Sequence, residues 1–170
     1  MWNKFTLLIF VLFFQCKNMD NNSILSIPEL SFMENGIDKF TEQYLINNSN
    51  YTILIHVDGT CFYCINDIRN MNIFFKNLKL VDTKIYYLLH FEQDTVLLKY
   101  FLKNIEVNFP IAIDYYNDFY FTNKKITKNE YSIYLLNNRK MKILFYGHPV
   151  HKKKDSLSFL RKLHRLDLVN

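Results

Sequence analysis

The order of apolar and polar positions along the chain predicts alternating strands and helices. An unbroken apolar run from Tyr51 to Val57, rich in β-branched residues, predicts a buried strand. Asp58, Gly59 and Thr60 predict a turn, and the next stretch, Phe62 to Leu78, predicts a helix. Its apolar residues recur at helical spacing: Ile65, Ile68, Met71, Phe74, Phe75 and Leu78.

The same reasoning predicts elements on both sides of this central stretch. A helix is expected over Phe32 to Asn47 and another over Glu92 to Ile105, and a final helix over Asp155 to Leu166. The predicted extended segments are Lys84 to Phe91, Asn108 to Asp114, and a closing hairpin of Tyr131 to Asn137 and Met141 to Gly147. Because strands alternate with helices, we expect an α/β fold whose sheet contains parallel strands.

The first residues have a different pattern. Lys4 precedes an apolar run from Phe5 to Phe14, which is too short to span a bilayer as a helix and is typical of a secretory signal peptide. Cys16 follows directly, and this arrangement resembles the lipidation site of bacterial lipoproteins. We therefore expect a signal peptide over residues 1–15, a lipidated Cys16 with a tether over 16–31, and one domain over 32–170. An uncleaved anchor, or a signal with an incidental cysteine, is the alternative.

Composition supports a single globular domain with one charged region. The chain has 170 residues, of which 49% are hydrophobic, enough to bury one core. The formal charge is +5, with basic residues gathered near the C-terminus at 152–154, Arg161, Lys162 and Arg165. Such a helix could touch anionic headgroups, but a solvated face is the default expectation. The basic run has no interleaved aromatic residues, so we expect no nucleic-acid partner.

Cys61 and Cys64 carry the chemistry that the sequence predicts. They lie where a strand passes into a helix, and the unpaired amides and dipole of a helix N-terminus stabilise an anion. We expect Cys61 to be the more acidic and exposed thiol, with Cys64 one helical turn away and within its reach. The pair could cycle between dithiol and disulfide, although two cysteines at this spacing also form half of many zinc sites.

The strand, turn, Cys-x-x-Cys and helix together resemble the active-site segment of the thioredoxin-like superfamily. Phe109 to Asp114 further resembles a segment of its redoxin-type branch, which includes membrane-tethered thiol-disulfide oxidoreductases. The resemblance implies a central mixed β-sheet flanked by helices, with a mid-domain insertion. It implies thiol-disulfide exchange with exported proteins, by a nucleophilic Cys61 and a resolving Cys64.

The resemblance also implies the surroundings of the cysteine pair. Substrate would contact Thr60, Phe62, Tyr63 and Tyr131. No cofactor is expected beyond the redox-active Cys61–Cys64 disulfide. The expected partners are protein thiols and disulfides of the cell envelope, in the periplasm or at the cell exterior, and the membrane through the lipid anchor. The protein is expected to be a monomer.

Two features keep other functions open. The superfamily usually has a cis-proline just before its closing hairpin, where this chain has Tyr131, and this absence favours a redox-inactive binding module. Two thiolates with an imidazole would suit Cu(I) or Zn(II), so a metal carrier is the other alternative. The candidate imidazoles are His56, His90, His148 and His151. We expect His56 in the core and the others on the solvated surface, with no metal ligand assigned.

Overall fold

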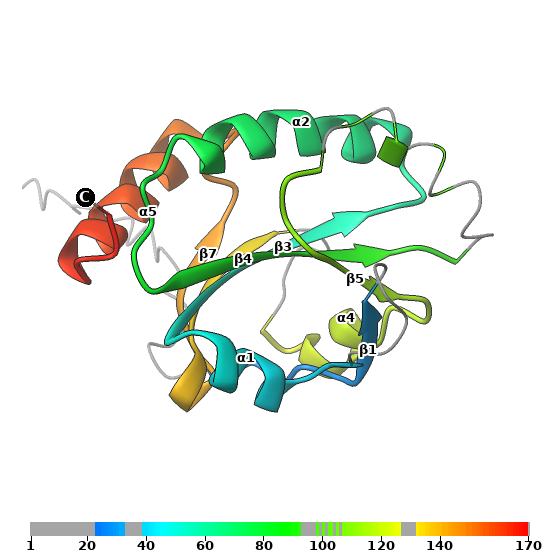
Figure 1. The fold of residues 1–170 in the computed structure, drawn as a ribbon, viewed down its shortest axis with the longest axis horizontal. Helices are drawn as coiled ribbons and strands as arrows, with labels where there is room; N and C mark the ends of the chain where they lie inside the picture. The colour runs from blue at the N-terminus through cyan, green and yellow to red at the C-terminus, as the bar shows by residue number, and fades with distance from the viewer. Residues whose placement is uncertain are drawn as a thin grey trace, which may run out of the picture.

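A seven-stranded mixed sheet forms the centre of the molecule (Figure 1). The structure is a computed structural model that describes residues 23–32, 39–92, 98, 100, 102, 103, 105, 107–126 and 132–169. The strand order is β2-β1-β5-β4-β3-β6-β7. The strands are β1 (Leu30–Phe32), β2 (Lys39–Phe40), β3 (Tyr51–Asp58), β4 (Thr83–His90), β5 (Ile111–Asp114), β6 (Ile133–Asn137) and β7 (Lys142–Gly147).

The strand directions match the mixed sheet expected from the sequence. β3, β4 and β5 run parallel to one another, whereas β6 and β7 form the antiparallel closing hairpin beside β3. β1 and β2 extend the other side of the sheet through antiparallel pairs. β5 and the helix that follows it lie in the chain between β4 and the hairpin, where the insertion was expected.

Helices cover both faces of the sheet. In Figure 1, α2 (Phe62–Lys76) and α5 (Lys153–Arg165) lie above it, and α1 (Glu42–Asn48) and α4 (Asp118–Asn123) lie below it. β3 shows why the central strand is apolar throughout. Ile53, Ile55 and Val57 pack into the core beneath α2 and α5, while Leu54 points to the core on the opposite face.

The helix predicted over Phe32 to Asn47 is wrong in its first part. Phe32 ends β1, and Phe40 lies in β2, opposite Leu30. The helix begins only at Glu42, because the Thr41 hydroxyl accepts a 3.1 Å hydrogen bond from the Tyr44 amide and so caps it. Residues 33–38 lie outside the described part of the chain.

The expected tether is in part a packed segment. Leu25 and Ile27 are buried, and the Leu25 amide donates a 2.8 Å hydrogen bond to the Met141 carbonyl. Residues 23–31 therefore belong to the domain, which begins before residue 32. β1 does not lie at the edge of the sheet, since β2 pairs with its outer side.

Other boundaries differ by a few residues. α2 ends at Lys76, two residues before Leu78, and α5 begins at Lys153, two residues before Asp155. Most of the helix expected over 92–105 lies outside the described residues, but Leu98 and Leu102 are helical and buried. Residues 1–22, with the expected signal peptide and Cys16, also lie outside them. No helix among the described residues has the length and apolarity needed to cross a membrane.

Candidate redox site

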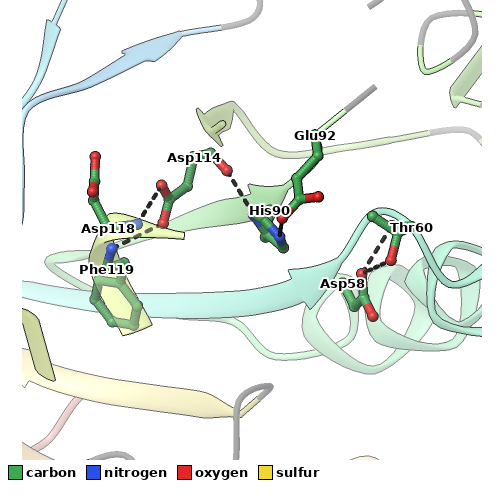
Figure 2. Close-up of polar contacts among 7 residues, drawn as sticks. All are labelled: Asp58, Thr60, His90, Glu92, Asp114, Asp118 and Phe119. Atoms are coloured by element: carbon green, nitrogen blue, oxygen red, sulfur yellow. Dashed lines mark hydrogen bonds and ion pairs between the residues drawn. The ribbon is translucent and has the colours of Figure 1, made fainter. Parts of the chain in front are cut away.

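The turn after β3 presents the cysteine pair at the carboxyl edge of the parallel strands. Asp58 ends β3, and its Oδ1 accepts hydrogen bonds from the Thr60 amide at 2.8 Å and the Thr60 hydroxyl at 2.6 Å (Figure 2). This Asx-type turn fixes the path of the chain into α2. Cys61 is the N-cap residue of that helix.

The two cysteines are joined as a disulfide. Their Cα atoms are 5.2 Å apart, and Cys61 Sγ accepts a 3.3 Å hydrogen bond from the Cys64 amide. When the bond is reduced, the same amide and the dipole of the 15-residue helix α2 favour the thiolate form of Cys61. Both residues are half-buried in this oxidised state.

His90 lies beside the turn at the end of β4. The Gly59 amide donates a 2.7 Å hydrogen bond to the His90 carbonyl, and Asp58 and Asp114 flank His90 in the neighbouring strands. The His90 ring is 3.3 Å from Glu92 Oε1 through Nε2, and its Nδ1 is 2.9 Å from the Asp114 carbonyl oxygen (Figure 2). The prediction of a solvated His90 is therefore wrong, because only 5% of the residue is exposed.

Asp114 anchors the segment after β5. Its carboxylate accepts hydrogen bonds from the Asp118 amide at 2.8 Å and the Phe119 amide at 2.9 Å, at the start of α4 (Figure 2). Burial raises the pKa of Asp114, although these two amide bonds partly oppose the shift. The aspartate that ends the predicted Phe109–Asp114 segment thus has a structural role.

A small cavity adjoins Cys64. It has a volume of about 170 Å³, and its walls include Cys64, Asp67, His148 and His151. Asp67 is one helical turn after Cys64, and its Oδ2 pairs with His151 Nε2 from the loop before α5. The sequence analysis missed Asp67, although its spacing of three residues from Cys64 could have indicated a shared helix face. His148 was predicted to be solvated, but it is half-buried and lines this cavity. His151 is exposed, as predicted.

The remaining predicted residues divide into three groups. His56 is buried, and its ring packs edge-on against Phe119 with centroids 5.0 Å apart, which confirms it as a core residue. Phe62 and Tyr63 are 59% and 84% exposed beside the disulfide, and Thr60 is exposed. Tyr131 lies outside the described residues. Within the described residues, no group of three His, Cys, Asp or Glu side chains is arranged to hold a metal ion.

Comparison with known proteins gives matches among solved structures. No family model and no curated protein matches the sequence. A protein from Chlorobium tepidum described as a thiol:disulfide interchange protein DsbE has 17% identity and a TM-score of 0.59, over 85% of this chain and 99% of its own. The exposed lipoprotein thioredoxin Etrx1 of Streptococcus pneumoniae has 15% identity and a TM-score of 0.58, over 80% of this chain and 98% of its own.

A copper-bound structure belongs to the same group of matches. Yeast Sco1 with copper bound has 13% identity and a TM-score of 0.56, over 84% of this chain and 94% of its own. These likenesses are to proteins of low sequence identity and concern the fold. Together with the strand order and the disulfide at the start of α2, they identify the chain as a protein of the thioredoxin-like fold.

Proposed function

We propose that the protein is a thiol-disulfide oxidoreductase that reduces disulfides of exported proteins. The observation that carries this proposal is the Cys61–Cys64 disulfide at the N-terminus of α2, with Cα atoms 5.2 Å apart. A helix N-terminus stabilises a thiolate, which is the reactive form of cysteine. The likeness to a thiol:disulfide interchange protein supports the same reaction.

The reaction begins with the reduced pair. The Cys61 thiolate attacks one sulfur of a substrate disulfide, a Cys61–substrate bond forms, and the other substrate sulfur leaves as a thiolate that takes up a proton. Cys64 then loses its proton and attacks Cys61 Sγ, which releases the second substrate thiol and forms the Cys61–Cys64 disulfide. Two electrons thus pass to the substrate, and a dithiol donor protein must return them.

Asp67 is the proposed proton acceptor for Cys64. It shares the cavity with Cys64, and its side chain is held by His151 at Oδ2 and by the Asn70 amide group at Oδ1, 3.0 Å away. A carboxylate beside the thiol can take its proton as the mixed disulfide is resolved. His151 would act as a positioning residue for this carboxylate.

The partner side of the proposal rests on the exposed surface around the pair. Phe62, Tyr63 and Thr60 surround Cys61, and we propose that they contact the substrate, together with Tyr131. Export and attachment to the membrane through Cys16 remain proposals from the sequence. They are supported by the likeness to the exposed lipoprotein thioredoxin Etrx1.

Active-site variants test the reaction. With insulin as substrate and dithiothreitol as donor, Cys61→Ser should abolish catalysed reduction, and Cys64→Ser should accumulate a mixed disulfide through Cys61. Cys16→Ser is the matched control, because it replaces a cysteine that the reaction does not use, and it should retain full activity. Undiminished activity in Cys61→Ser would overturn the proposal.

Metal carriage is the second candidate, favoured by the likeness to copper-bound Sco1. The reduced cysteines would supply two sulfur ligands for Cu(I). Both ring nitrogens of His90 already face oxygen atoms, whereas His148 and His151 line the cavity beside Cys64 and are the candidate imidazole ligands. Titration of the reduced chain with Cu(I) against a competing chelator tests this function. Binding of one equivalent that Cys61→Ser abolishes would support it, and binding of none would exclude it.

A further inference from the structure

Helix α5 concentrates the net charge of the chain. The segment from Lys152, the N-cap residue of α5, to Arg165 contains six Lys or Arg residues and one Asp. Its net charge therefore equals the formal charge of +5 of the whole sequence. The remaining fifteen basic residues are matched by fifteen acidic ones. Attraction to an anionic surface would therefore act mainly through this one helix.

Packing holds the helix in one rotational position. Phe159 and Leu163 are fully buried, and the Phe159 ring lies with its centroid 5.0 Å from that of Phe145 on β7 and 6.0 Å from that of Phe75 on α2. Residues at intervals of four from Lys153 then fall on the outward side. This outward row consists of Lys153, Leu157, Arg161 and Arg165, and all four are exposed.

The outward row is cationic without an acidic neighbour on the same side. Asp155, the only acidic residue of α5, accepts a 2.9 Å hydrogen bond from the His148 amide and faces the loop before the helix. Lys153, Arg161 and Arg165 form no ion pair with any carboxylate in the described part of the chain. The positive charge of the row is thus available to a partner.

We propose that the outward row of α5 docks the protein on an anionic membrane surface. Leu157, which is 47% exposed, lies between Lys153 and Arg161, and an apolar side chain among cations suits the boundary between headgroups and acyl chains. Phe159 is the only Phe, Tyr or Trp residue of α5, and it is buried, so the helix offers no exposed Phe, Tyr or Trp ring on which nucleic-acid bases could stack. The apolar run Phe5 to Phe14, which predicts export, would bring the chain to a membrane.

Docking through this row would orient the redox site. Figure 1 shows the C-terminal part of α5 at the opposite end of the molecule from the start of α2, where Cys61 lies. With Arg161 and Arg165 on the headgroups, the disulfide would lie at the other end of the molecule from these two contacts, accessible to soluble partner proteins. This orientation does not depend on which redox reaction the pair performs.

Vesicle binding tests the proposal with the full chain. At low ionic strength we expect about tenfold tighter binding to vesicles of equal phosphatidylglycerol and phosphatidylcholine than to phosphatidylcholine alone. The triple variant Lys153→Gln, Arg161→Gln, Arg165→Gln should lose this preference. The control variant Lys79→Gln, Lys124→Gln, Lys140→Gln removes three exposed charges elsewhere and should keep it. In about 1 M salt the preference should vanish, because charges are screened beyond about 3 Å.

Any membrane binding by the apolar run Phe5 to Phe14 is common to the native chain, the α5 variant and the control variant, so it cancels in the comparison. Equal binding to both vesicle types, or an anionic preference that survives in the α5 variant, would overturn the proposal. Binding to a duplex DNA fragment without preference for anionic vesicles would also overturn it and indicate a nucleic-acid surface. Unchanged circular dichroism and insulin reduction in the triple variant would establish that the fold and redox site are intact.

Discussion

The amide of Gly59 donates a 2.7 Å hydrogen bond to the carbonyl oxygen of His90. This bond ties the turn before Cys61 to the end of β4. The His90 ring is in turn 2.9 Å from the Asp114 carbonyl oxygen, so the cysteine turn, β4 and β5 form one connected edge. The position of the disulfide therefore depends on contacts that lie outside the Cys-x-x-Cys motif.

Gly59 has no room for a side chain. A Cβ atom there would lie 2.6 Å from the His90 carbonyl oxygen and 2.9 Å from Phe91 Cδ2. We expect Gly59→Ala to lower the free energy of unfolding by about 1–3 kcal/mol and to shift the turn before Cys61. Urea denaturation measures the loss. Thr60→Ser is the control, because serine retains a hydroxyl that can bond Asp58. Equal stability of Gly59→Ala and the native protein would contradict the close packing at Gly59.

Asp67→Asn should slow the resolving step without preventing the first attack. The side-chain amide of Asn cannot accept the Cys64 proton. The rate at which Cys64 resolves the mixed disulfide should therefore fall by about tenfold to a hundredfold at pH 7. The deficit should shrink as the pH approaches about 8.5, where thiols ionise unaided. Stopped-flow measurement of mixed-disulfide decay from pH 6 to about pH 9 checks this profile.

Asp167→Asn is the matched control for that experiment, since it removes a carboxylate on the chain after α5 at a positive φ angle that Asn tolerates. Its decay rate should equal that of the native protein. A pH-independent deficit in Asp67→Asn would instead indicate that Asp67 has only a structural role.

His148 should make stability depend on pH. Burial lowers the pKa of His148 from its ordinary value of 6.5. The nearby Lys152 and His151 lower this pKa further, whereas Asp155 and Asp67 partly oppose the shift. The unfolded chain then takes up a proton at higher pH than the folded chain, so stability falls as the pH drops below 6.5. Above that value the contribution is constant.

Urea denaturation of the native protein and His148→Gln at pH 5 to about pH 8 tests this linkage. The variant should show a smaller loss of stability between neutral and acidic pH. Parallel curves for the two proteins would rule out a contribution from His148.

Asn138 should be essential to the hairpin turn. Its Nδ2 lies 3.0 Å from the Leu45 carbonyl, 2.8 Å from the Ser49 carbonyl and 3.0 Å from the Thr52 hydroxyl, and the residue is fully buried. Asn138→Ala leaves buried acceptors unpaired and should cost about 1–3 kcal/mol. Thermal denaturation checks the value against Arg139→Ala, an exposed neighbour whose effect should stay within about 0.5 kcal/mol.

The parts of the fold that local pattern determines could be predicted from sequence. The β-branched run of β3 and the helical spacing of Ile65, Ile68 and Phe75 in α2 each arise within one element, and both predictions are confirmed. The prediction of a helix over Phe32–Asn47 was wrong in its first half, because the spacing of Phe40 from Tyr44 matches a helical period by chance. Phe40 instead pairs with Leu30 in a neighbouring strand, a contact that periodicity does not register.

The part of the site that is built from residues close together in the sequence could be predicted. Cys61, Cys64 and their position at a helix start follow from the motif and the strand before it. The Asp67–His151 pair joins residues 84 positions apart, and the contact of the His90 ring with the Asp114 carbonyl oxygen joins residues 24 positions apart. Such relationships arise from the packing of separate elements, and a single sequence gives no direct sign of them.

The reduction potential of the Cys61–Cys64 pair tests the central claim most directly. The chain would be equilibrated in graded glutathione and dithiothreitol buffers, and the fraction of free thiol measured by alkylation. An exchange enzyme predicts a reversible two-electron transition between roughly −120 and −270 mV, the span of thioredoxin-like catalysts, and a protein that reduces disulfides predicts a value toward the −270 mV end. A disulfide that resists reduction well below that span, as in a redox-inactive binding module, or a pair that oxidises only after a metal is removed, would contradict the account.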